Sequence, residues 1–128
     1  MSLTEATFAG LRAWLQTFAP TAVVGQTFAG CDCPLAMYLR KWVADGVTVF
    51  VDWKYVRVTD TRGESWYPLF DEASDFVTVI DAIPDADVVI MVTAEQALAA
   101  LDEVTWRCPL PPVGLVGSRV ARPDEWSW

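Results

Sequence analysis

The stretch "VTVFVDWKYVRVTDTRGESWYPL", residues 47–69, decides the fold class. β-Branched and aromatic residues dominate it, and turn-forming residues interrupt it at "DTRGE", residues 60–64. Between residues 55 and 59, polar or aromatic side chains alternate with valines, which is the period-two pattern of a half-buried strand. We therefore expect two or three antiparallel strands, near residues 47–52, 54–60 and 64–68.

Apolar residues at helical spacing precede this stretch. Ser2 and Glu5 have the form of a capping box, and the pattern behind them predicts a helix over residues 3–18. A second helix is expected to begin near Pro34 and to stop at Gly46. Proline fits the first helical turn because its missing N–H is not needed there, and glycine is typical of a helix end.

Two further helices are expected after the strands. The segment "LFDEASDFVTVIDAI", residues 69–83, returns to helical spacing and is stopped by Pro84. Thr93 and Gln96 form another capping box, which opens the helical pattern "AEQALAALDEV" at residues 94–104.

These patterns predict one α+β domain spanning residues 1–128, with a small antiparallel sheet flanked by about four helices. The expected order is α-α-β-β-(β)-α-(β)-α. Two short apolar segments, "TAVVGQTF" at residues 21–28 and "DVVIMV" at residues 87–92, are candidate strands. The proline-rich C-terminal tail is expected to be irregular and to pack over the core through its apolar residues.

Composition narrows the function classes. The chain has 128 residues, of which 53% are hydrophobic, so a core can form without disulfides or metal. No apolar run approaches the roughly 18 residues of a membrane span, and the first residues lack the pattern of a signal peptide. We expect a cytoplasmic protein without membrane contact. The sequence contains no histidine, which removes the commonest general base and zinc ligand. We therefore expect no cofactor and no metal, and we lean against an enzyme.

The negative charge is concentrated in one segment. The net charge is −8, and residues 63–106 carry ten acidic residues and no basic residue. Phosphate contacts need Lys and Arg, so direct nucleic-acid binding is not expected, whereas a basic protein partner is. Trp53 and Trp106 stand in expected turns, where exposure would indicate an interface. The candidate interaction surface comprises seven of these ten acids and two tail tryptophans: Asp71, Asp75, Asp81, Asp85, Asp87, Asp102, Glu103, Trp126 and Trp128.

Cys31 and Cys33 allow three interpretations. A thiol at a helix start is a candidate reactive or redox group, because the helix N-terminus stabilises thiolate. A metal site would need Cys108 and a carboxylate or water as further ligands. The structural interpretation, which we favour, treats the cysteines as small buried residues and makes Asp32 the N-cap of the second helix.

The segments "CPLAMYLRKW", "PLFDEASDFVTVID" and "VTAEQALAAL" carry a resemblance. In their order and spacing the chain resembles a group of small uncharacterised bacterial proteins with a Cys-Pro-Leu helix start and a C-terminal "TAEEAL"-like helix. The resemblance implies the same order of elements. It implies no activity, because none is known for that group.

The sequence thus favours a non-catalytic interaction or regulatory module that uses an acidic face to bind a basic protein partner and that forms a homodimer. A phage-type inhibitor that occupies a nucleic-acid-binding surface is one specific form of this hypothesis. The alternative is a thiol-based redox protein or enzyme that uses Cys31 or Cys33.

Overall fold

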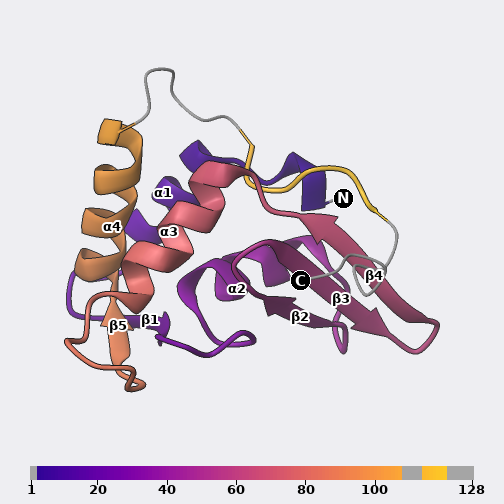
Figure 1. The fold of residues 1–128 in the computed structure, drawn as a ribbon, viewed down its shortest axis with the longest axis horizontal. Helices are drawn as coiled ribbons and strands as arrows, with labels where there is room; N and C mark the ends of the chain where they lie inside the picture. The colour runs from indigo at the N-terminus through magenta and orange to yellow at the C-terminus, as the bar shows by residue number, and fades with distance from the viewer. Residues whose placement is uncertain (1–2, 108–113, 121–128) are drawn as a thin grey trace.

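The computed structural model describes residues 3–107 and 114–120 and confirms the α+β class. Strands β2, β3 and β4 are consecutive along the chain, with helices before and after them (Figure 1). The elements are the 3₁₀ helix η1 (Leu3–Glu5), α1 (Phe8–Gln16), β1 (Val23–Gln26), α2 (Pro34–Leu39), the 3₁₀ helix η2 (Arg40–Trp42), β2 (Thr48–Val51), β3 (Tyr55–Asp60), β4 (Gly63–Pro68), α3 (Asp71–Asp81), β5 (Met91–Thr93) and α4 (Ala94–Arg107).

The stretch at residues 47–69 folds into an antiparallel three-stranded sheet in the order β2-β3-β4, as the sequence predicts. Phe50, Arg57 and Trp66 lie directly opposite one another across the three strands. Val49 and Val56 are buried in the core. The alternation of side chains therefore gives the sheet one face toward the core and one toward the outside.

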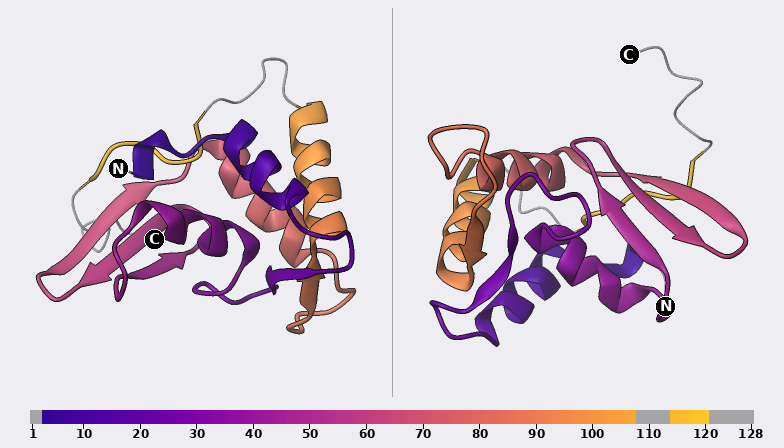
Figure 2. Two further views of the ribbon diagram at one scale, coloured as in Figure 1. Left: turned by 180° about the vertical axis from the view of Figure 1, so that it is seen from behind. Right: turned by 90° about the horizontal axis from the view of Figure 1, so that it is seen from below.

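The two short apolar segments form a separate two-stranded sheet, in which β1 pairs with β5. This antiparallel pairing joins parts of the chain nearly 70 residues apart, with Val23 opposite Thr93 and Gln26 opposite Met91. The sheet lies at the foot of α4, whereas β2-β3-β4 lies at the opposite end of the molecule (Figures 1 and 2).

Of the two capping boxes expected from the sequence, the structure describes one completely. The expected single helix over residues 3–18 is divided, since η1 precedes α1 and Thr7 caps α1 by accepting the Gly10 N–H at 3.0 Å. Ser2 lies outside the described residues. The capping box before α4 is confirmed: the Thr93 N–H donates to Gln96 Oε1 at 3.0 Å, and the Gln96 N–H donates to Thr93 Oγ1 at 3.2 Å.

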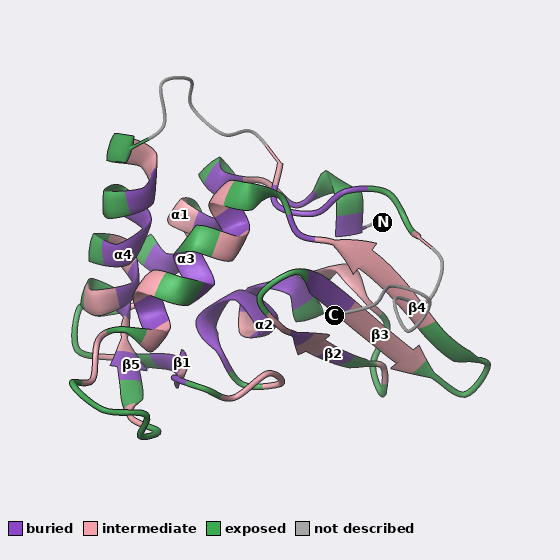
Figure 3. Ribbon diagram, in the orientation of Figure 1, coloured by how far each residue is buried: buried purple, intermediate pink, exposed green. Residues whose placement is uncertain are grey.

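The core lies between the helices and the inner faces of the sheets. α3 packs against α4, which also packs against α1, and the buried residues of α4 lie on its inner side (Figure 3). Leu115 and Val116 are buried as well, so the described part of the tail packs into the core as expected. None of the described helices has the length and apolar character that crossing a membrane requires. Helix α3 passes between α4 and the three-stranded sheet (Figures 1 and 2). This position lets α3 contribute residues to the candidate site described next.

Candidate functional site

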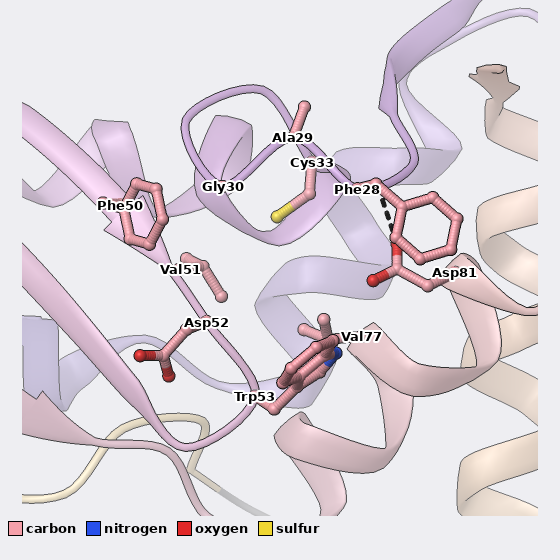
Figure 4. A pocket seen from close by; sticks show the side chains of 10 residues that line it. All are labelled: Phe28, Ala29, Gly30, Cys33, Phe50, Val51, Asp52, Trp53, Val77 and Asp81. Carbon is pink, nitrogen blue, oxygen red and sulfur yellow. Dashed lines mark hydrogen bonds between the residues drawn. The ribbon is translucent and has the colours of Figure 1, made fainter. Parts of the chain in front are cut away.

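A pocket of about 300 Å³ opens where the loop after β1, the turn between β2 and β3, and α3 meet (Figure 4). Its size falls at the lower end of the range typical of ligand pockets. The lining is mostly apolar and aromatic, with two carboxylates. It consists of Phe28, Ala29, Gly30, Cys33, Phe50, Val51, Asp52, Trp53, Val77 and Asp81.

Phe28 stands at the rim of this pocket in a strained backbone conformation. Its φ is +53°, in the left-handed region that costs a residue with a side chain roughly 1–2 kcal/mol. The Phe28 N–H donates to Asp81 Oδ1 at 2.9 Å. The preceding residue, Thr27, is fully buried, and its hydroxyl donates to the Val88 carbonyl and accepts the Ile90 N–H. These bonds hold the loop so that a phenyl ring that is 40% exposed stays at the rim.

Trp53 stands at the tip of the turn between β2 and β3. Asp52 Oδ1 accepts the N–H groups of Lys54 and Tyr55 at 2.7 and 2.5 Å, which fixes the turn. The Trp53 carbonyl accepts the Ser74 hydroxyl of α3. The backbone of Trp53 is therefore anchored at both sides while its side chain remains 60% exposed.

Phe50 forms the opposite wall of the pocket, close to Gly30. A Cβ at Gly30 would lie 2.6 Å from Cζ of Phe50, so only glycine lets the ring approach the loop. The Gly30 carbonyl accepts the Val51 N–H at 2.9 Å and ties the loop to β2. The Arg57 guanidinium lies 4.7 Å from the Phe50 ring centroid and covers one of its faces.

The two carboxylates of the lining differ in direction. Figure 4 shows the Asp52 side chain pointing toward the β2–β3 turn, where one of its oxygens accepts backbone N–H groups. The Asp81 side chain has one oxygen on the Phe28 N–H and the other directed into the pocket. Asp81 is therefore the residue that gives the pocket its negative charge.

Cys33 closes the inner wall of the pocket. It is 5% exposed, and burial, more than the nearby Asp81 charge, raises the pKa of its thiol to about 11. Cys33 rather than Asp32 is the N-cap of α2, with Sγ accepting the Ala36 N–H at 3.4 Å. The predicted cap was wrong because Asp32 instead forms an ion pair with Arg40 at 3.0 Å. A buried, protonated thiol is a poor nucleophile, which weakens the redox alternative at this position.

Cys31 is half-buried, and both it and Cys33 are free thiols. Among residues 3–107 and 114–120, no group of three or more His, Cys, Asp or Glu side chains is placed to hold a metal ion. Cys108, on which the metal interpretation depended, lies outside the described residues.

The acids of the predicted interaction surface occupy several settings. Asp71 and Asp75 are exposed on α3, and Asp85 and Asp87 are exposed in the segment after it. Asp102 pairs with Arg12 at 2.5 Å, and Glu103 pairs with Arg107. Arginines therefore balance part of the charge on α4, and of the members of this surface that the structure describes, Asp81 alone lines the pocket. Trp126 and Trp128 lie outside the described residues.

Sequence reasoning singled out Asp81 and Trp53 but missed the pocket that joins them. Trp53 and Trp106 are both exposed, the latter by 88%, but Trp106 lies in α4 and not in a turn as expected. The missed members, above all Phe28, Phe50 and Val77, are apolar residues in three separate segments, and nothing in their local pattern distinguishes them from core residues. Comparison of the chain with models of protein families, with curated proteins and with solved structures finds no match.

Proposed function

We propose that the protein is a non-catalytic interaction module that holds a cationic side chain of a basic partner protein in the pocket beside α3. One observation carries this proposal: the Asp81 carboxylate is directed into a pocket whose other lining side chains are mostly apolar and aromatic. A carboxylate beside aromatic rings favours a bound cation, because the carboxylate attracts it by charge and the ring faces attract it by cation–π contact.

The exposed rings support a binding role. Trp53 and Phe28 are large apolar side chains left partly exposed on rigid backbone, and such residues are frequent anchors at the centre of protein interfaces. The backbone strain at Phe28 also supports a binding role. Unfavourable backbone conformations persist where the surrounding structure holds them, and they cluster at functional sites.

Long-range charge supports a basic partner. The net charge of −8 would steer a positively charged surface toward the protein before contact. Asp71 and Asp75 lie on α3, the helix that ends at Asp81, and add negative charge near the pocket. Association should therefore slow as salt is added, since exposed charges are screened beyond about 8 Å at physiological ionic strength.

Affinity capture from the host cell with matched variants tests the proposal. The wild-type protein is compared with Trp53→Ala and Asp81→Asn; asparagine can keep an oxygen that accepts the Phe28 N–H, whereas its amide NH2 replaces the second oxygen and the negative charge is lost. Val89→Ala and Asp45→Asn change an exposed apolar side chain and an exposed aspartate that belong neither to the pocket nor to the predicted interaction surface. A partner lost with both pocket variants and retained with both controls supports the proposal, and a partner retained by all four opposes it.

The narrower hypothesis of a phage-type inhibitor predicts a further result of this experiment. The captured partner should then be a nucleic-acid-binding protein, and it should lose its nucleic acid when the complex forms. A partner with no nucleic-acid-binding surface would rule out this form of the proposal and leave the pocket's role intact.

A further inference from the structure

The number of free acceptors in the pocket restricts which cation fits. Asp52 Oδ1 accepts two backbone N–H groups, and the Asp52 carboxylate points toward the β2–β3 turn and not into the pocket (Figure 4). Asp81 Oδ1 accepts the Phe28 N–H at 2.9 Å, which leaves one Asp81 oxygen for a ligand. Within the described residues, the pocket therefore offers a ligand cation one Asp81 oxygen with no hydrogen bond from the protein and one that the Phe28 N–H already shares.

Lysine and arginine place different demands on such an acceptor. The guanidinium fork of arginine binds a carboxylate best through two parallel hydrogen bonds, one to each oxygen. Because the Phe28 N–H already donates to one Asp81 oxygen, a guanidinium bond to that oxygen would be shared and weaker, and further guanidinium donors would face apolar groups, which is unfavourable. An ammonium is a compact charge that bonds one oxygen well and can keep its other protons toward water at the open mouth.

The remaining walls suit a long apolar stem with a compact charge at its end. Val51, Val77 and the buried Cys33 thiol line the inner part, and they match methylene groups better than a planar polar head. Phe50 already has one face covered by the chain's own Arg57, so it supplies apolar surface. Phe28 and Trp53 remain as the rings available for cation–π contact.

We infer that the pocket selects the ammonium of a lysine side chain over the guanidinium of an arginine. The inference rests on the proposed function of the pocket and names the chemistry of the residue that the basic partner inserts. It assigns Asp81 as the specificity-determining residue, with Phe28 acting on specificity through the N–H that occupies one Asp81 oxygen.

Small probes test this inference without knowledge of the partner. n-Butylammonium, n-butylguanidinium and 1-butanol share a four-carbon stem and differ in the head group. Each is titrated into the isotope-labelled full chain, with the backbone amides of Phe28 and Gly30 and the indole N–H of Trp53 as NMR reporters. We expect the ammonium to bind about three- to fivefold more tightly than 1-butanol, since partly exposed ion pairs contribute up to about 1 kcal/mol. We also expect it to bind more tightly than n-butylguanidinium.

The variants and salt isolate the role of Asp81. In Asp81→Asn the preference for the ammonium over 1-butanol should disappear, and in Asp45→Asn, at an exposed aspartate outside the pocket, it should remain. In the wild type alone, raising the salt concentration should reduce this preference and leave 1-butanol binding unchanged, which keeps the inference testable if Asp81→Asn does not fold.

The outcomes separate the two proposals. Equal or tighter binding of n-butylguanidinium, or an ammonium preference that survives both Asp81→Asn and added salt, would overturn the lysine inference while the pocket keeps its proposed role. If none of the three reporters responded to any probe, the pocket would not bind these ligands, and the proposed function would be refuted as well.

Discussion

Replacing Phe28 tests whether the rim of the pocket is strained. At an ordinary position alanine is more stable than glycine by about 0.4–1 kcal/mol, because glycine loses more backbone freedom on folding. At Phe28 the φ of +53° costs any residue with a Cβ about 1–2 kcal/mol and costs glycine almost nothing. Both replacements remove the same phenyl ring and keep the N–H that bonds Asp81, so the ring and the hydrogen bond cancel in the comparison.

The difference between the two costs favours glycine by about 1 kcal/mol. Phe28→Gly should therefore unfold at a higher urea concentration than Phe28→Ala, with the same dependence of the free energy of unfolding on urea. In thermal unfolding the gap should be about 4 °C for a domain of this size.

Val89 provides the control pair, because it is exposed and its φ is not positive. There the order should reverse, with Val89→Ala at least as stable as Val89→Gly. If alanine were also the more stable replacement at Phe28, the rim would be unstrained, and the argument that strain marks a functional site would fail.

Three further predictions concern other parts of the fold. Gly25→Ala should destabilise the protein by about 1–3 kcal/mol in thermal unfolding, because the new Cβ would lie 2.6 Å from the backbone nitrogen of Pro34; an unchanged Tm would show that β1 can move away. Stability should fall between pH 9 and 11, because the unfolded chain loses the Cys33 proton near pH 9.0 and the folded chain only near 11. The loss from this group is about 2–3 kcal/mol. Cys33→Ala should lose less stability over this pH range. Some loss should remain, because burial also raises the pKa of tyrosines that are present in both proteins. Identical pH profiles for the two proteins would contradict the assignment of the loss to Cys33. Self-association, if it uses the exposed apolar residues around β1 and β5, should be reduced by replacing Val23 and Met91 with serine, and sedimentation showing only monomer in the wild type would exclude it.

Local signals predicted the elements that depend on neighbouring residues. The alternation around Val56 and the turn residues before Gly63 were enough to place β3 and β4 to within a residue or two. The capping box of Thr93 and Gln96 placed the start of α4, because both partners are contained in the motif itself.

Features that depend on distant residues could not be predicted from local patterns. Asp102 was assigned to an interaction surface, yet it pairs with Arg12, which is 90 residues away. The pocket likewise joins residues 28–33, 50–53 and 77–81, which only the packing of α3 beside the three-stranded sheet brings together. Phe28 gives no sequence signal, since a positive φ at a phenylalanine is imposed by Asp81 and by the buried Thr27 beside it.

The central claim is that this pocket receives the stem and charge of a cationic side chain. The most direct measurement is of NMR cross-relaxation between the methylene protons of n-butylammonium and the protein at saturating probe. We predict cross-peaks from the methylenes to the rings of Phe28 and Trp53 and to the methyl groups of Val77. Cross-peaks confined to Val23 and Met91, which lie exposed at the β1–β5 sheet, would contradict the claim, as would their complete absence at saturation.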